Sequence, residues 1–498
     1  MILRNLMPVP AQVETAAGEL HFGAEVTLRV NAPLLTEGMI EEYRGLWNRY
    51  GMRLAALRVV RDGRLEENCA VLAAADIACP ALAPGDEYAL TVTESGAFVR
   101  GESAVGLLHG LFTLVQLVVP IRLEGEADYA MPAVRIHDRP AIRGMRAIHL
   151  CVFPETTLLL LEKAIRLAGM MKFTHVVLEF WGMLRYDTLP ELAWPRHAYS
   201  KEQIRPLVRL IQDLGMEVIP MLNHLGHAAQ CRSCYGKHVV LDQNPARALL
   251  FEPDGWTWCI SNPETRRVLR GLRQELIDLC GSGKYFHLGC DESYSYATCP
   301  ICSTQDTRRL LADYLNELTV ELAAQGRRPI IWGDQLLDTT VWKHPNIATS
   351  RPDQRTHEAL PLLDKRIVIA DWQYSLTEPK APTMEHFMKQ GFDTLICPWD
   401  GHGNNEAMGE AADRAHAFGF MATTWDHLPE YLRLMPTVAG SCWNGAGFDA
   451  EKRGQCSWTE IATMLRKVMP KLPEYHNAGW IGREVLEFDE SVRRNLQP

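Results

Sequence analysis

Two adjacent carboxylates, Asp291 and Glu292, follow an apolar run that begins at Phe286. In α/β enzymes, the acidic side chains that transfer protons commonly lie just after the ends of strands. Burying neighbouring acids is costly unless each is hydrogen-bonded or neutralised, so such pairs often mark a functional site. The alternative is that both are ordinary loop residues or cap the next helix. The elements around the pair have to decide between these readings.

Other polar and aromatic side chains follow the remaining apolar runs that we predict to be strands. Aromatic walls with acids between them suit a sugar, because its C–H faces stack on indole rings while its hydroxyls take directed hydrogen bonds. A single Trp in such a place more often fills the core, but four Trp residues ending four predicted strands favour a binding surface. The polar and aromatic residues that follow the predicted strands are Glu179, Trp181, Asn223, His224, His227, Trp332, Asp334, Trp372, Tyr374, Trp399, Asp400, Trp425, Asp426 and His427.

The strands that carry these residues alternate with helical patterns. Eight strand–helix repeats over roughly 300 residues predict a (β/α)₈ TIM barrel, in which the loops after the strands form the active face. The predicted strands are Gly144–Leu150, Phe173–Phe180, Glu217–Leu222, Tyr285–Cys290, Pro329–Trp332, Ile367–Trp372, Thr394–Trp399 and Phe420–Trp425. Helical patterns between them cover Thr156–Met170, Lys201–Leu214, Pro263–Leu279 and Asp306–Ala324.

A smaller α+β domain precedes the barrel. Residues 1–137 alternate short β-like runs (Ala24–Val30, Tyr88–Val92) with amphipathic helical patterns (Leu35–Tyr50, Ser103–Val118). We therefore divide the chain into an N-terminal domain, 1–137, and a barrel with a C-terminal extension, 138–498.

Composition limits the partners. The 498 residues carry a net charge of −10 and no basic block, which argues against nucleic acid or an anionic membrane as the main partner. No stretch approaches the roughly 20 apolar residues of a membrane helix, and the first residues lack a secretory signal pattern. Thirteen cysteines without a staple-like spacing suggest a reducing cytoplasm. We expect a small-molecule glycan or amino-sugar substrate; the sequence says little about assembly, for which a homodimer is one candidate.

The residues at these strand ends resemble those of the family 20 glycoside hydrolases, the β-N-acetylhexosaminidases. The strand-four motif of that family, His-x-Gly-Gly-Asp-Glu, is similar to His287-Leu-Gly-Cys-Asp-Glu292. Arg143-Gly144 resembles the Arg-Gly pair that opens the family's barrel, and Leu225-Gly-His227 resembles its Pro-Gly-His ending of strand three. Val9-Pro10 and the segment from Gly106 to Leu117 resemble the preceding α+β domain.

The resemblance implies retaining hydrolysis assisted by the substrate, in which the sugar's own 2-acetamido oxygen attacks the anomeric carbon and gives an oxazolinium-type intermediate. Glu292 would protonate the leaving oxygen and later activate water, which requires a raised pKa. Asp291 would hold the acetamide N–H and stabilise the developing positive charge. Arg143 would grip ring hydroxyls and His227 would orient the site. Trp332, Trp372 and Trp425 would wall the sugar, with Tyr374 as candidate acetamide partner.

This chain also departs from the family pattern. Cys290 stands where the family has Gly, and Asn223 where strand three usually has Asp. Strand two ends in Glu179-Phe-Trp181, and the late family motifs are replaced by Pro398-Trp399-Asp400 and Trp425-Asp-His427. A His in place of an acid near the outer hydroxyls could favour another epimer or an anionic substituent such as sulfate. The inner chemistry therefore looks retained while the specificity stays open.

Two rival functions remain. One is a non-catalytic glycan-binding relative that keeps the aromatic cleft; the intact Asp291-Glu292 pair and Arg143 argue against it. The other is a barrel glycosidase of different sugar specificity, which would not need the acetamide.

Two cysteine pairs suggest a metal site away from catalysis. Cys231-Arg-Ser-Cys234 follows predicted strand three, and Cys299-Pro-Ile-Cys302 follows strand four. Because loops after adjacent parallel strands lie side by side, four thiolates could bind a closed, structural zinc, with His238 able to replace one of them. Free thiols or a disulfide are the alternatives, and we expect no cofactor for catalysis. Cys290 lacks an evident paired base and is not predicted to be a nucleophile.

Overall fold

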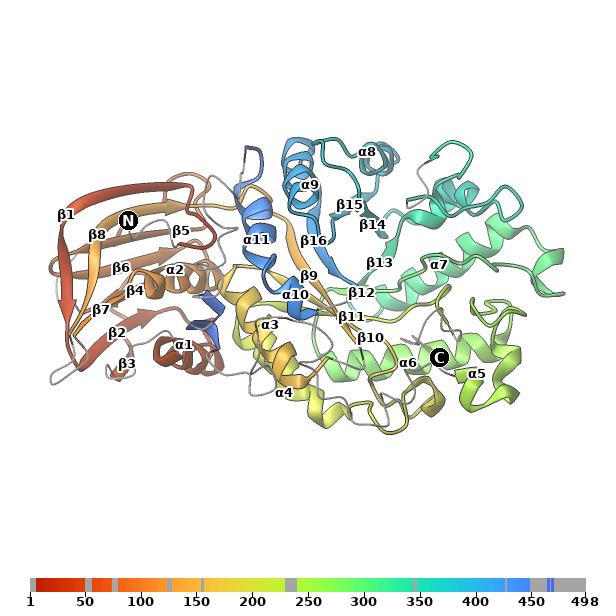
Figure 1. The fold of residues 1–498 in the computed structure, drawn as a ribbon, viewed down its shortest axis with the longest axis horizontal. Helices are drawn as coiled ribbons and strands as arrows, with labels where there is room; N and C mark the ends of the chain where they lie inside the picture. Colours follow the sequence, from red (N-terminus) through yellow and green to blue (C-terminus); the bar gives the residue numbers. More distant parts are fainter. Residues whose placement is uncertain are drawn as a thin grey trace.

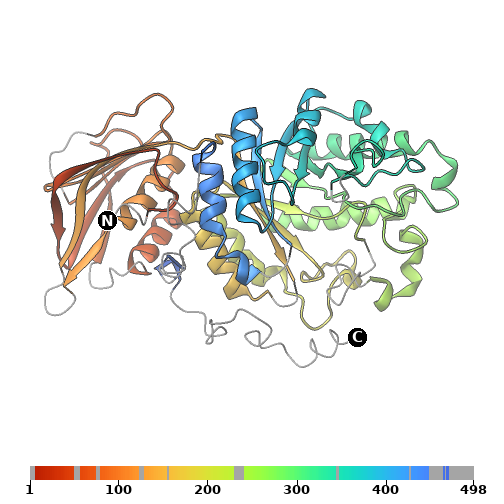
Figure 2. The ribbon, with the colours of Figure 1, turned by 45° about the horizontal axis from the view of Figure 1, so that its top comes forward.

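The computed structural model describes residues 6–49, 56–73, 79–122, 128–153, 156–228, 240–343, 347–425, 428–447, 464, 465 and 467–469. An N-terminal β-sheet domain lies at one end of the molecule and a closed barrel at the other (Figures 1 and 2). The predicted fold class, a TIM barrel preceded by a smaller α+β domain, is confirmed.

The N-terminal domain is an eight-stranded sheet covered by two helices. The strand order is β1-β8-β5-β6-β4-β2-β3, with β7 pairing with β8, and most pairs are antiparallel. Helix α2 is apolar on nearly all sides because it lies between the sheet and the barrel, where Leu108 approaches Gly215 (Figure 1). The elements are β1 (Gln12–Phe22), β2 (Glu25–Asn31), α1 (Glu37–Arg49), β3 (Ala56–Arg61), β4 (Cys69–Leu72), β5 (Tyr88–Thr93), β6 (Gly96–Gly101), α2 (Ala104–Gln116), β7 (Val119–Arg122) and β8 (Asp128–Asp138).

Eight parallel strands close the barrel, in agreement with all eight predicted strands. Each strand pairs with the next in the chain, and the last, β16, pairs with the first, β9. The strands are β9 (Met145–Val152), β10 (His175–Phe180), β11 (Glu217–Met221), β12 (Tyr285–His287), β13 (Arg328–Trp332), β14 (Val368–Trp372), β15 (Asp393–Cys397) and β16 (Gly419–Thr424). The helices are α3 (Leu158–Met170), α4 (Lys201–Asp213), α5 (Val240–Gln243), α6 (Pro263–Cys280), α7 (Thr307–Ala323), α8 (Pro382–Lys389), α9 (His402–Ala415), α10 (Leu428–Tyr431) and α11 (Met435–Asn444).

Strand β12 is shorter than the sequence indicates. The apolar run predicts a strand to Cys290, whereas β12 ends at His287. Gly289 and Cys290 have positive φ angles of 67° and 76°, which no strand can contain. The chain therefore turns sharply just before the two acids, so their side chains do not follow the alternation of the strand. None of the helices in the described part of the chain combines the length and the hydropathy that a membrane span requires.

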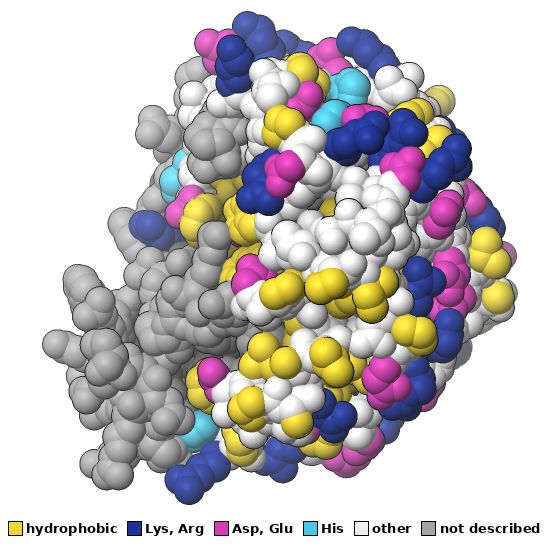
Figure 3. All heavy atoms as spheres, turned by 90° about the vertical axis from the view of Figure 1, so that its right-hand side faces the viewer, with side chains coloured by type: hydrophobic (Ala, Val, Ile, Leu, Met, Phe, Trp, Pro, Cys, Tyr) yellow, Lys and Arg dark blue, Asp and Glu magenta, His cyan; other side chains and the backbone are white. Residues whose placement is uncertain are grey.

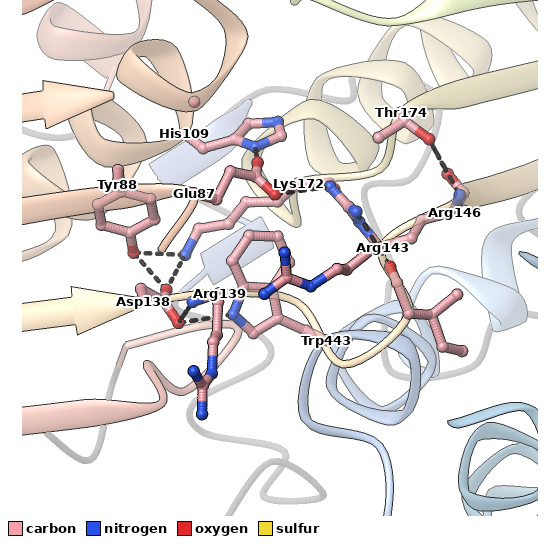
Figure 4. A network of polar contacts seen from close by, with 12 residues as sticks. Glu87, Tyr88, His109, Asp138, Arg139, Arg143, Arg146, Lys172, Thr174 and Trp443 are labelled. Atoms are coloured by element: carbon pink, nitrogen blue, oxygen red, sulfur yellow. Dashed lines mark hydrogen bonds and ion pairs between the residues drawn. The ribbon is translucent and has the colours of Figure 1, made fainter. Parts of the chain in front are cut away.

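A buried carboxylate, Asp138, connects the two domains (Figure 4). It is fully buried at the end of β8 and accepts hydrogen bonds from Ala11 N at 2.9 Å and from Trp443 Nε1 of α11 at 2.8 Å. Its second oxygen accepts from Tyr88 Oη and, at 3.0 Å, from Lys172 Nζ after α3. One side chain thus joins the N-terminal sheet to both ends of the barrel sequence.

A second polar contact at this junction involves Glu87. Its carboxylate contacts His109 of α2 and Arg146 of β9, the latter at 3.3 Å. Burial alone would raise the pKa of Glu87, but the charges of His109 and Arg146 outweigh it and hold the pKa at about 2. The junction is therefore charged and hydrogen-bonded, which fixes the orientation of the domains more narrowly than apolar packing would.

We predict that Lys172→Met destabilises the protein by about 3–5 kcal/mol, because Asp138 would remain buried without its counter-charge. The measurement is thermal unfolding of the variant and of Lys380→Met, whose partner Glu378 is exposed. The control should unfold close to the wild type. Equal shifts in the two variants would contradict a structural role for the Asp138–Lys172 pair.

Candidate active site

A cavity of about 350 Å³ opens among the loops that follow the barrel strands. This volume lies within the range of small-molecule sites, about 300–1,000 Å³. Figure 3 looks onto the end of the molecule away from the N-terminal domain, where apolar side chains gather across the middle and charged ones lie along much of the edge. The cavity is lined by Trp181, His227, Asp291, Glu292, Trp372, Tyr374, Trp399 and Trp425.

The two acids are presented by strained backbone. Besides Gly289 and Cys290, Glu292 has a positive φ of 44°, and so does His227 on the facing loop, at 56°. Non-glycine residues in this region cost energy and persist where surrounding structure holds them, commonly at functional sites. Gly226 permits the close contact between the loops, since a Cβ there would lie 2.0 Å from the carbonyl oxygen of Asp291.

The imidazole of His227 lies between the two carboxylates. Its Nε2 is 3.2 Å from Asp291 Oδ2 and 3.3 Å from Glu292 Oε2. Asp291 also accepts a hydrogen bond from Asn223 Nδ2 at 2.6 Å. The Asp291 side chain is 9% exposed and that of Glu292 is 27% exposed. Asp291 is thus held from two sides, while Glu292 has more access to the cavity.

A third carboxyl group, Asp334, lies behind the pair. Its Oδ2 accepts hydrogen bonds from the backbone N–H of Glu292 at 2.9 Å and from Thr349 Oγ1 at 2.6 Å. Complete burial, followed by the charge of Asp291, raises the pKa of Asp334 from its ordinary value of 3.8 to about 7. Around neutral pH, Asp334 therefore exchanges between a neutral and a charged form directly behind Glu292.

Aromatic rings form the opposite wall of the cavity. Trp372 and Tyr374 stack at 5.0 Å between centroids, and Trp399 lies 5.5 Å from Tyr374. Trp425 Nε1 donates to Tyr374 Oη at 2.5 Å, which fixes both side chains, and Trp181 lies 6.0 Å from Trp425. Indole and phenol faces at fixed angles around two acids can stack on a sugar ring while its hydroxyls reach polar groups.

Two of the predicted binding residues lie beneath the cavity rather than on its surface. Trp332 is fully buried and packs its ring 5.4 Å from that of Trp425. Glu179 is buried as well, where its Oε2 lies 3.0 Å from His149 Nε2 and accepts from Cys151 Sγ at 3.3 Å. Trp332 therefore packs directly behind the aromatic wall, and Glu179 contacts it through His149, whose ring lies 4.8 Å from that of Trp425.

The expectation for Arg143 requires correction. Arg143 precedes β9 and donates from its guanidinium to the carbonyl oxygen of Gly85 in the N-terminal domain at 2.9 Å. It lies at the start of the first barrel strand, whereas the cavity is at the ends of the strands. The Arg-Gly resemblance thus marks the entrance of the chain into the barrel, and the side chain bridges domains instead of gripping sugar hydroxyls.

The other predicted residues divide into three groups. Asp291, Glu292, His227, Trp372, Tyr374, Trp399 and Trp425 come together in the cavity. Asp400 follows Trp399 but is exposed and is not among the lining residues. Cys231, Cys234, His238, Asp426 and His427 lie outside the described residues.

Cys290 behaves as an inert buried thiol, as expected. Its Sγ donates to the carbonyl oxygen of Leu288 at 3.4 Å, and burial raises its pKa well above the ordinary value. A buried thiol of this kind carries little thiolate and is a poor nucleophile.

Sequence reasoning gave too little weight to two aromatic residues and one acid. Trp181 and Asp334 stand among the residues that follow predicted strands, but neither the strand pattern nor the family resemblance assigns them an individual role. Trp256 carried no signal, because it lies in the long segment between β11 and α6. Its ring packs 4.5 Å from His227, and its Nε1 donates to the carbonyl oxygen of Glu292 at 2.6 Å.

Comparison with known proteins matches both domains to one family. The family model described as "Glycosyl hydrolase family 20, catalytic domain" matches residues 176–429. The model described as "Glycosyl hydrolase family 20, domain 2" matches residues 3–139. These two segments cover the N-terminal sheet and most of the barrel.

Individual relatives are distant. A β-hexosaminidase of Porphyromonas gingivalis is 23% identical over 371 residues, which are 67% of this chain and 46% of the relative. A β-hexosaminidase of Akkermansia muciniphila is 25% identical over 280 residues, 50% of this chain and 55% of the relative. The chain thus spans about half the length of these curated relatives. The solved structure of Flavobacterium johnsoniae chitobiase shares the fold, with a TM-score of 0.67 and 16% identity over 93% of this chain and 72% of that chain.

We predict that Asp334→Asn changes how stability depends on pH. From about pH 4 to about pH 7, the folded wild type keeps a proton that the unfolded chain releases, so stability falls as pH rises. Asn cannot titrate, so the melting temperature of the variant should improve relative to wild type across this window. The difference corresponds to a few kcal/mol, at about 1.4 kcal/mol for each pH unit.

A matched control is Asp371→Asn. Burial also raises the pKa of Asp371 to about 7, but its partners are Gln373 and Thr383. Both variants should therefore show the same stability trend, while Asp334→Asn alone alters the pH dependence of turnover. A constant melting difference between Asp334→Asn and wild type at all pH values would refute the assignment.

Proposed function

Since this chain belongs to family 20 of the glycoside hydrolases, we propose that it is a retaining exo-β-N-acetylhexosaminidase. It would remove terminal β-linked N-acetylglucosamine or N-acetylgalactosamine from a glycan. The observation that carries this proposal is the pair of carboxylates held by one imidazole, His227, inside a cavity walled by aromatic rings. A charged and a protonated acid, side by side, suit hydrolysis in which the substrate supplies its own nucleophile.

Asp291 is suited to hold the acetamide. It is the more buried acid, it accepts a hydrogen bond from Asn223, and His227 Nε2 lies 3.2 Å from its second oxygen. Its remaining acceptor capacity can take the N–H of the substrate's acetamide group. That bond would turn the acetamide oxygen toward the anomeric carbon, and the carboxylate would stabilise the positive charge that develops on the oxazolinium ring.

Glu292 is suited to move the proton. It is more exposed than Asp291 and faces the cavity. In the first step it would donate a proton to the glycosidic oxygen as that bond breaks, and the acetamide oxygen would form a bond to the anomeric carbon. In the second step Glu292 would take a proton from water as the water oxygen attacks the anomeric carbon. The bond from that carbon to the acetamide oxygen breaks, so the oxazolinium ring opens and the β configuration is restored.

Tyr374 is suited to the acetamide carbonyl. Its ring lies in the wall of the cavity, and the hydrogen bond from Trp425 fixes the position of its hydroxyl oxygen. An O–H donated to the acetamide oxygen would position it, and Trp372 and Trp399 would stack on the sugar and the acetamide methyl.

Glu292→Gln should lower kcat/KM by about 10²–10⁴ on substrates with poor leaving groups, because the general acid is lost. It should affect 4-nitrophenyl N-acetyl-β-glucosaminide much less, since nitrophenolate leaves without protonation. Asp291→Asn should impair both substrates. Parallel kinetics on the 4-nitrophenyl and the methyl glycoside measure this difference. Equal losses of Glu292→Gln on both substrates would contradict the assigned role.

An acetamide-derived thiazoline should inhibit the enzyme competitively and far more tightly than N-acetylglucosamine binds, because it mimics the ring of the intermediate. Inhibition constants for the two compounds are the measurement. Turnover that the thiazoline does not inhibit would favour the glycosidase of other specificity. Sugar binding without turnover of gluco, galacto or 6-sulfated substrates would favour the non-catalytic relative.

A further inference from the structure

Three thiols and one carboxylate converge beside the loop that carries the two acids. Cys259 comes from the segment between β11 and α6, and Cys299 and Cys302 come from the segment after β12. Glu252 completes the group, and ligand atoms of all four residues lie within 4.8 Å of one another. All four residues are buried. Nothing in the proposed hydrolysis uses these side chains.

The sulfur–sulfur distances suit a tetrahedral metal. Cys259 Sγ lies 3.6 Å from Cys299 Sγ and 3.6 Å from Cys302 Sγ. A disulfide would need about 2.0 Å between sulfurs. Thiolates bound to one tetrahedral zinc at about 2.3 Å lie about 3.8 Å apart. The observed separations are therefore close to those of metal ligands and far from those of a bonded pair.

Hydrogen bonds around the three thiols and the carboxylate also favour a metal site. The backbone N–H of Cys302 points to Cys299 Sγ at 3.3 Å, as in a Cys-x-x-Cys turn that stabilises a thiolate. Glu252 Oε2 accepts from the backbone N–H of Cys299 at 2.6 Å, which orients the carboxylate toward the sulfurs. Ordered partners of this kind commonly hold metal ligands in place.

We propose that Cys259, Cys299, Cys302 and Glu252 bind one zinc ion in a closed, structural site. Three thiolates with one carboxylate oxygen give the four ligands of tetrahedral zinc, and soft sulfur ligands disfavour magnesium or calcium. The ligand set differs from the one that the Cys-x-x-Cys spacing suggests. Cys299 and Cys302 join Glu252 and Cys259, which has no cysteine three positions away.

The zinc would brace the loop of the catalytic acids. The segment that supplies Glu252 and Cys259 also carries Trp256, which bonds the backbone of Glu292 and packs on His227. In the same segment, Thr257 accepts a hydrogen bond from Ser295 of the segment after β12, at 2.9 Å. A metal that joins both segments would hold Trp256 against the acids, so its loss should loosen the active face.

The test is the zinc content of the whole chain, purified without added metal and measured by plasma emission. We expect about one zinc per chain in the wild type and in Cys280→Ala, which removes a buried thiol elsewhere. Cys259→Ala should lose most of the metal. Glu252→Gln should bind zinc about 10–100-fold more weakly in chelator competition, because Gln brings no charge to the ion.

A second measurement covers the case in which Cys259→Ala does not fold. Cobalt exchanged into the wild type should give the strong near-ultraviolet absorption of thiolate-to-cobalt charge transfer, and zinc should protect three thiols from a thiol reagent. Zinc below about 0.2 per chain with these thiols reactive, or a disulfide among them, would overturn the proposal. Unchanged affinity in Glu252→Gln would overturn the carboxylate ligand. None of these readouts depends on hydrolytic activity.

Discussion

The active face depends on how the electrostatic repulsion among three neighbouring, poorly solvated carboxyl groups is reduced. Asp291, Glu292 and Asp334 meet at the ends of β12 and β13, where like charges repel strongly because water is largely excluded. The structure resolves this in two ways. Asn223 donates a hydrogen bond to Asp291 and His227 lies 3.2 Å from it, while burial keeps Asp334 protonated up to about neutral pH. Hydrolysis in the proposed form also needs neighbouring acids in different protonation states, with Asp291 ionised and Glu292 protonated in the first step.

Keeping three carboxyl groups close together requires a rigid backbone, and here loops provide the rigidity rather than strands. Strand β12 stops early, and left-handed residues at Gly289, Cys290 and Glu292 turn the acids into the cavity. Trp256 and the close approach at Gly226 press the neighbouring loop against them. The barrel provides the frame, and the charged junction around Asp138 fixes the N-terminal domain to it.

The barrel was predictable because buried parallel strands are continuous apolar runs with polar side chains at their ends. The same rule identified most of the cavity, from His227 to Trp425. The rule failed for residues whose position depends on the path of a loop. It also failed where a motif lies at the start of a strand and not at its end. Arg143 precedes its strand and faces the other domain, Trp256 lies in a long irregular segment, and Cys259 has no sequence neighbour to suggest a ligand.

The central claim is that the substrate's acetamide oxygen is the nucleophile, guided by Asp291. The most direct measurement is kcat/KM for 4-nitrophenyl β-glucosaminides that carry N-acetyl, N-fluoroacetyl, N-difluoroacetyl and N-trifluoroacetyl groups. Each fluorine withdraws electrons from the carbonyl oxygen without moving it far. The account predicts a steep fall in rate with each fluorine. Rates that stay within about twofold across the series would contradict it, because an enzyme nucleophile would not sense the substitution.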